Sequence, residues 1–202
     1  RFLWNLGYEI LLPWQRSHGQ SEGRYITYGV KERYDCRKWI QYANSQLGAK
    51  EKDIFLCGIS MGCATVLMTA GLKLPKNVRG TIADCGFTSP WEIVCHDVRK
   101  KYHLPPYPLM FFVNAICRIA AGFSLKEASA EEAMKKNKIP VLFIHGDKDR
   151  YVPMWMTYRN YQACAAPKEL YIVPGAAHAL AFSYDREEGR RRIKHFIQKN
   201  ER

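Results

Sequence analysis

A serine, an aspartate and a histidine in this chain stand where nucleophilic chemistry would need them. Ser60 lies in the pentapeptide 58–62, Gly-Ile-Ser-Met-Gly, which fits the pattern G-x-S-x-G. Asp149 and His178 each follow a short apolar run, as Ser60 does. A serine hydroxyl is a weak nucleophile, so it needs a neighbouring base and a third group that orients this base. The order serine, aspartate, histidine is the order that accompanies G-x-S-x-G turns.

The turn at Ser60 is predicted to connect a buried strand over residues 53–59 to a helix that ends near Gly71. Such a turn strains the backbone of the serine and raises its hydroxyl above the sheet edge. We expect glycine at positions 58 and 62 because side chains there would collide with the neighbouring strand and helix. The Met61 N–H, at the positive end of the helix, is expected to point toward a developing oxyanion.

Alternating strands and helices predict how these residues are positioned. An α/β fold follows, with a mainly parallel sheet and helices on both faces, because parallel strands need helical crossovers. The carboxyl ends of parallel strands meet at one sheet edge, so the three residues should converge there. Asp84, at the end of one strand, could approach the site, but we expect it to stabilise the turn that follows the strand. Besides the strand before Ser60, the predicted strands cover residues 8–12, 78–83, 140–144 and 169–173, and the predicted helices cover 30–47, 154–164 and 185–199.

Residues 91–138 interrupt this alternation, and we predict that they form a helical cap over the catalytic edge, broken at residues 104–108. The alternative is an ordinary crossover, which needs far fewer residues. The apolar run 109–121 is too short to span a bilayer and contains Arg118. Some aromatic residues of this segment are expected to line an apolar acyl pocket; they are Tyr102, Tyr107, Phe111, Phe112 and Phe123.

The composition fits one domain, residues 1–202, with a formal net charge of +12. Basic residues are spread along the chain and no nucleic-acid motif is found, so no nucleic-acid partner is expected; an acidic substrate or a membrane surface stays open. The seven cysteines show no metal-ligand spacing, so neither a metal nor a cofactor is expected. Without a disulfide framework or signal peptide, we expect a reducing, cytoplasmic location. The oligomeric state is left open.

Together, the motifs resemble those of the α/β-hydrolase superfamily, and within it the bacterial serine-aminopeptidase-like or acyl-ester hydrolases. The resemblance covers almost the whole chain. One departure is Trp14-Gln15, where the family commonly has an acidic residue before R-x-H-G-x-S. The matching segments are residues 16–21, 58–62, 145–153 and 175–178.

The resemblance implies that Ser60 is the nucleophile, His178 the general base, Asp149 the orienting acid and Met61 an oxyanion donor. We call residues 145–153, which contain Asp149, the acid loop. Asp147 is expected to shape the turn in this loop, and His145 to support it. The implied activity is a serine hydrolase that cleaves a small carboxylic ester, thioester or amide through an acyl-enzyme. Acyl transfer on the same triad is one alternative. A non-catalytic binding module, or an inactive fragment that lacks part of the oxyanion hole, is another.

The resemblance also implies that the chain opens at the fourth strand of the fold. We therefore expect about three further strands and a helix upstream, on the order of 40–80 residues at ordinary element lengths. The chain would then be N-terminally incomplete, and a second oxyanion donor would lie in the upstream part. A signal or anchor in that part would change the expected location.

Overall fold

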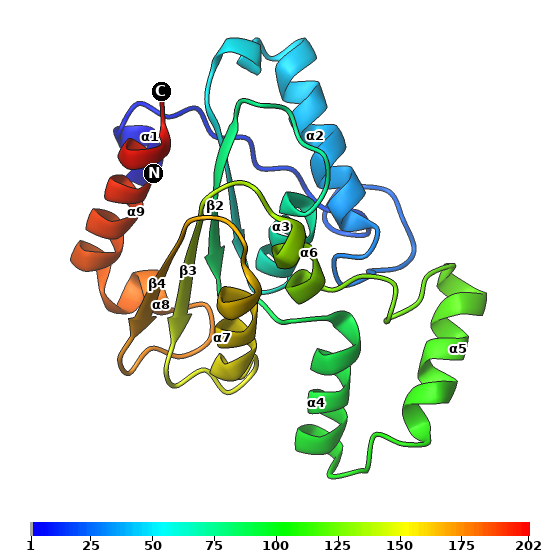
Figure 1. The fold of residues 1–202 in the computed structure, drawn as a ribbon. Helices are drawn as coiled ribbons and strands as arrows, with labels where there is room; N and C mark the ends of the chain where they lie inside the picture. Colours follow the sequence, from blue (N-terminus) through cyan, green and yellow to red (C-terminus); the bar gives the residue numbers. More distant parts are fainter. Residues whose placement is uncertain (1) are drawn as a thin grey trace.

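A computed structural model describes residues 2–202 as one parallel sheet covered by helices on both faces (Figure 1). The strand order follows the sequence, and each strand pairs in parallel with the next. Ile59 is level with Asp84, and Asp84 with Ile144, so the strands end at a common edge. The strands are β1 (Ile54–Ile59), β2 (Val78–Asp84), β3 (Val141–Gly146) and β4 (Lys168–Val173).

The two faces of the sheet bury separate apolar clusters, as an alternating fold requires. One face carries α2 (Glu32–Gln46), α3 (Met61–Ala70), α6 (Ala130–Lys136) and α7 (Met154–Ala163). The other carries α1 (Phe2–Asn5), α8 (Ala181–Tyr184) and α9 (Arg186–Asn200), and a short 3-10 turn, Ala49–Glu51, precedes β1. The prediction of a mainly parallel sheet with helices on both faces is confirmed.

The strand expected at residues 8–12 is wrong. These residues form neither strand nor helix, and Leu12 is 84% exposed. A strand needs a hydrogen-bonding neighbour, which an apolar run does not supply by itself. Within residues 2–202, β1 pairs only with β2, so it is an edge strand of the described sheet.

The segment expected to form a cap is helical and interrupted where predicted. It contains α4 (Pro90–Tyr102) and α5 (Leu109–Ala121), which stand apart from the sheet near the carboxyl ends of its strands (Figure 1). We call residues 90–121 the α4–α5 arm. By contrast, α6 packs on α3 and α7 as part of the body, and a Cβ on Gly71 would lie 2.7 Å from Ala133 Cβ.

Helix lengths limit how the described chain can relate to a bilayer. No helix within residues 2–202 combines the length and the apolar character that crossing a membrane requires. The most apolar helix of the arm, α5, has 13 residues, whereas a spanning helix needs about 20.

Candidate active site

Ser60 sits in a strained turn between β1 and α3, with φ 54° and ψ −117°. Its N–H donates to the Asp84 carbonyl at 2.9 Å, which ties the turn to β2. A Cβ on Gly58 would lie only 2.3 Å from the Gly62 carbonyl oxygen, so glycine is required at position 58. A Cβ on Gly62 would meet nothing within 4 Å, so the collision expected there is wrong. The close approach is one-sided because only the Gly58 Cα faces the opposite backbone.

The three residues predicted to converge do meet, each from the loop after a different strand. His178 Nε2 lies 2.8 Å from Ser60 Oγ, and His178 Nδ1 lies 2.6 Å from Asp149 Oδ2. With Nδ1–H donated to the carboxylate, Nε2 is left as an acceptor for the serine proton. This is the arrangement of a nucleophile, a base and an orienting acid.

The Asp149 carboxylate is held by several donors. Its Oδ1 accepts the N–H groups of Tyr151 at 2.8 Å and of Val152 at 3.0 Å. Burial alone would raise the pKa of Asp149, but hydrogen bonds from His145, His178 and the Tyr151 N–H outweigh it and hold the pKa well below its usual range. Asp149 is therefore ionised and able to orient His178.

Two neighbouring side chains in the acid loop have the structural places expected for them. Asp147 Oδ1 accepts the Gly175 N–H at 2.6 Å and so joins the loops after β3 and β4. His145 is fully buried, with Nδ1 2.7 Å from Thr157 Oγ1 and Nε2 3.0 Å from the Val152 carbonyl. Because Nε2 must donate to that carbonyl, Nδ1 accepts the threonine hydroxyl.

The Met61 N–H stands at the first position of α3, where no intrahelical acceptor exists. It donates no hydrogen bond to any acceptor within residues 2–202. The positive end of the helix dipole adds to its pull on an anion. This N–H is thus available to a negative oxygen formed at Ser60.

Asp84 and Cys85 both lie near the site, so the less favoured of the two places considered for Asp84 is the one the structure shows. Asp84 is 6% exposed, its Oδ1 has no partner within the described chain, and burial raises its pKa to about 6. Burial also raises the pKa of the Cys85 thiol far above its usual value. Among residues 2–202, Cys85 is the third member of a possible metal-ligand group, with atoms of Asp149 and His178 within 4.8 Å. Since Asp149 and His178 bond each other, we assign no metal there.

The α4–α5 arm reaches the candidate site through the acid loop. The Tyr151 ring lies 5.4 Å from the His178 ring, and Lys101 Nζ lies 5.9 Å from the Tyr151 ring centre. Lys100 Nζ also donates to the Arg150 carbonyl. Of the aromatic residues expected to line an acyl pocket, Phe123 is instead in the core at 5% exposure, because it follows the turn that brings the chain back to the body.

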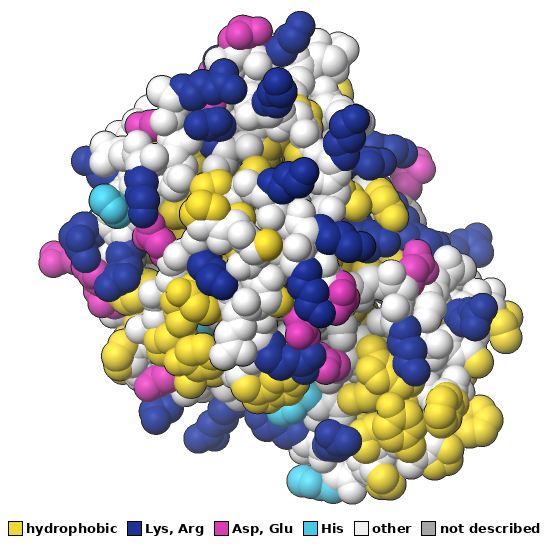
Figure 2. Space-filling view, viewed as in Figure 1, with side chains coloured by type: hydrophobic (Ala, Val, Ile, Leu, Met, Phe, Trp, Pro, Cys, Tyr) yellow, Lys and Arg dark blue, Asp and Glu magenta, His cyan; other side chains and the backbone are white. Residues whose placement is uncertain are grey.

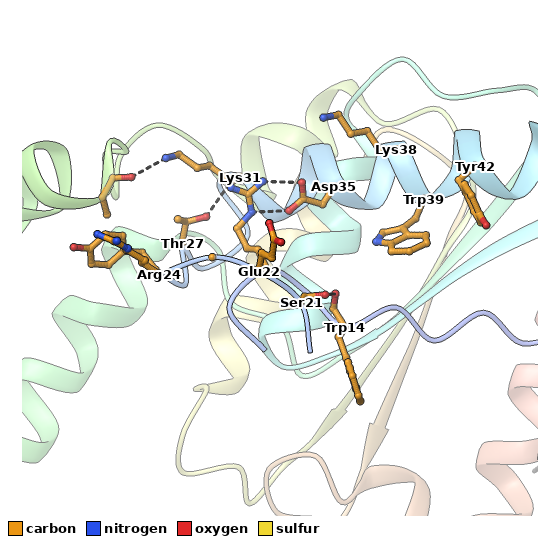
Figure 3. Close-up of a pocket in the computed structure, with 14 residues that line it drawn as sticks. Trp14, Ser21, Glu22, Arg24, Thr27, Lys31, Asp35, Lys38, Trp39 and Tyr42 are labelled. Carbon is orange, nitrogen blue, oxygen red and sulfur yellow. Dashed lines mark hydrogen bonds and ion pairs between the residues drawn. The ribbon is translucent and has the colours of Figure 1, made fainter. Parts of the chain in front are cut away.

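A cavity of about 860 Å³ lies away from these residues, between α2, the loop 14–27 and the end of α5. Figure 3 shows Trp14, Trp39 and Tyr42 along it, and Asp35, which pairs with Arg16 at 2.6 Å. Neither Ser60, Asp149 nor His178 lines this cavity. None of the residues that line it takes part in the hydrogen bonds that join Ser60, His178 and Asp149.

Comparisons with known proteins identify the family and the fold of the chain. The protein YqkD of Bacillus subtilis (strain 168) is 32% identical over 193 residues, which are 96% of this chain and 63% of YqkD. Among solved structures, the esterase Pf2001 of Pyrococcus furiosus has a TM-score of 0.77 at 23% identity, over 98% of this chain and 73% of that one. A lipase-esterase related protein of Clostridium acetobutylicum has a TM-score of 0.63 at 22% identity, over 90% and 80%. These structural likenesses show the α/β-hydrolase fold.

The chain thus spans less than two thirds of the length of YqkD. The model of the prolyl oligopeptidase family matches residues 21–201, a range that includes Ser60, Asp149 and His178. This match covers most of the chain, including all four strands of the sheet. The chain therefore belongs to the prolyl oligopeptidase family, within the α/β-hydrolase superfamily.

Proposed function

We propose that this domain is a serine hydrolase that cleaves a carboxylic ester, a thioester or a small amide. The observation that carries the proposal is the hydrogen-bonded chain from Ser60 Oγ through His178 to Asp149, with separations of 2.8 and 2.6 Å. Membership of a family of esterases and peptidases supports the same reaction class. Ser60, Asp149 and His178 are the proposed catalytic residues.

In the proposed reaction, Ser60 Oγ attacks the substrate carbonyl while His178 Nε2 takes its proton. The Met61 N–H donates to the oxyanion, and the ionised Asp149 stabilises the imidazolium. His178 then protonates the leaving group, which departs and leaves an acyl-enzyme. Water, deprotonated by His178, releases the acid and restores Ser60.

Peptide-bond cleavage is the second candidate, because the family match is to the prolyl oligopeptidases. Both candidates use the same nucleophile; a peptide bond releases an amine, as a small amide does, whereas an ester releases an alcohol. Pf2001 is called an esterase, but at 23% identity the likeness to it bears on the fold alone. Acyl transfer would follow if an alcohol or amine replaced water in the second step.

We further propose that residues 91–138 contain the substrate-selecting cap. The contacts of Lys100 and Lys101 with the acid loop support α4 as its wall next to the site. Substitutions at Tyr102 and Tyr107, both more than 45% exposed, should change the preferred acyl chain length without changing the labelling of Ser60. Unchanged chain-length preference would contradict this role.

The test of the proposed function is covalent labelling with a fluorophosphonate probe, followed by mass spectrometry. The adduct is expected on the Ser60 peptide and is expected to vanish in Ser60→Ala, while Ser45→Ala, at an exposed serine of α2, should label normally. A panel of esters and amides, with and without an added alcohol, then separates esterase, peptidase and transferase activity. An adduct on another residue, or no adduct, would contradict the proposal.

A further inference from the structure

The α5 helix exposes a continuous apolar face. Leu109, Phe112, Ile116 and Ile119 follow one another at intervals of three or four residues, so they form one stripe along the helix. Phe112, Ile116 and Ile119 are 65%, 63% and 87% exposed. Phe111, beside the stripe, is 59% exposed. A helix of a monomeric protein usually turns such a stripe toward its own core.

The side of α5 that faces the protein is smaller. Met110 is its buried residue, and Val113 and Cys117 pack against the core from partly buried positions. Figure 2 shows the resulting apolar patch at the lower right, over the α4–α5 arm. Contiguous exposed apolar surface of this kind marks an interaction site. The charged side chains around this patch indicate what kind of partner it could bind.

The charges nearest this surface are mostly basic. Asp97, which pairs with Lys101 at 3.5 Å, and Glu127 lie just outside residues 98–126. Residues 98–126 contain five basic side chains and no aspartate or glutamate; the five are Arg99, Lys100, Lys101, Arg118 and Lys126. Lys126 Nζ lies 4.0 Å from the Trp91 ring and 6.0 Å from the Phe111 ring, so a cation borders the apolar face directly. Figure 2 shows basic side chains along the border of the patch. The chain as a whole carries a net charge of +12.

We propose that the α4–α5 arm docks on an anionic lipid bilayer, with the α5 stripe buried at the level of the headgroups. An apolar helix face with a basic border is the composition of helices that lie in the membrane interface. Anionic headgroups attract nearby lysine and arginine, and acyl chains accept the apolar side chains. A second copy of this chain fits less well, since a two-fold contact would place the same five cations opposite one another.

This inference goes beyond the proposed hydrolase activity and does not depend on it. Docking uses side chains of α5, whereas hydrolysis uses loops after β1, β3 and β4. The contacts of Lys100 and Lys101 nevertheless join α4, the other helix of the arm, to the loop that carries Asp149.

The experiment is co-sedimentation of the full chain with vesicles, comparing phosphatidylcholine alone with a mixture containing phosphatidylglycerol. Binding is expected to the anionic vesicles, to be weak on neutral ones, and to fall as salt is added. Ile119→Asp should lower the partition coefficient at least about tenfold, because it removes apolar contact and adds repulsion. Leu12→Asp is the matched control, since Leu12 is 84% exposed but lies outside the arm.

Two further measurements keep the outcomes distinct. Fluorophosphonate labelling of Ile119→Asp should remain at the level of the unsubstituted chain, which separates docking from the hydrolase proposal. Equal binding to neutral and anionic vesicles, or equal losses in Ile119→Asp and Leu12→Asp, would overturn the inference. A dimer in light scattering that Ile119→Asp abolishes, without vesicle binding, would overturn it in favour of a second copy.

Discussion

The candidate site and the α4–α5 arm lie side by side and are built in opposite ways. At the site, the Asp149 carboxylate accepts from two backbone N–H groups and lies within 3.2 Å of two histidine rings. On the arm, α5 leaves Phe112, Ile116 and Ile119 largely exposed. Contacts within the chain hold the side chains of the site in position. The exposed side chains of α5 have few such contacts.

This difference separates two kinds of residue. A side chain that many internal contacts hold should respond strongly to small changes in its chemistry. Replacing a side chain without internal contacts should change the stability of the protein alone very little. Such a replacement should matter only when the external partner is present. The following substitutions test that distinction, each against a matched position.

The largest effect is expected for Asp149→Asn, which should lower kcat on an ester about 10⁴-fold because the amide favours the wrong histidine tautomer. Asp147→Asn should stay within about tenfold, since the amide oxygen still accepts the Gly175 N–H. Steady-state kinetics of both variants measure this. Equal losses would mean that the two aspartates do not differ in role.

Gly58→Ala should destabilise the fold by about 3 kcal/mol, because its Cβ would meet the Gly62 backbone, which has no room to move. Gly62→Ala should be neutral or stabilising by up to about 1 kcal/mol, since its Cβ enters open space in a helix. Urea denaturation of both variants gives the two free energies of unfolding. A similar cost at both positions would show that the turn is crowded on both sides.

Asp84→Asn should stabilise the protein by about 2–3 kcal/mol at pH 7, because it removes a buried carboxylate. The folded-state pKa of Asp84, about 6, is above its unfolded value of 3.8, so its ionisation lowers stability as pH rises between these values. The advantage of the variant should therefore grow by about 1 kcal/mol from pH 5 to pH 7. Urea denaturation at both pH values measures it, and an advantage that shrinks as pH rises would contradict the assigned burial effect.

The smallest effect is expected on the arm. Phe112→Ser should change the free energy of unfolding by no more than about 0.5 kcal/mol, since the ring has few internal contacts. Met110→Ala, on the buried side of the same helix, should cost about 2–5 kcal/mol. Thermal or urea unfolding compares them. A large cost for Phe112→Ser would show that α5 packs through its outer face as well.

Periodicity and motif spacing predicted most of the fold, because strands and helices of an alternating sheet carry strong local signals. The turn at Ser60 and the loops of Asp149 and His178 follow parallel strands, so their meeting at one edge could be foreseen. The failed strand at residues 8–12 shows the limit, since strand formation depends on a neighbour that the local sequence does not describe.

Other features could not be predicted from the sequence, because they depend on what surrounds a residue in the folded protein. Asp84 is polar and ends a strand, which is equally typical of a turn; only burial in three dimensions raises its pKa. Likewise, Gly62 fits the motif as well as Gly58 does, although only Gly58 faces opposing backbone. The apolar side chains of the arm suggested an acyl pocket, and spacing alone does not tell which of them face outward.

The positive φ of Ser60 lowers the stability of the fold, whereas the proposed chemistry requires a serine at this position. A non-glycine residue with φ near 54° costs on the order of 1 kcal/mol, which glycine would relieve. Ser60→Gly is therefore expected to melt at a higher temperature and to have no nucleophile. A screen for thermostability without an activity measurement would select the variant in which the proposed reaction is impossible.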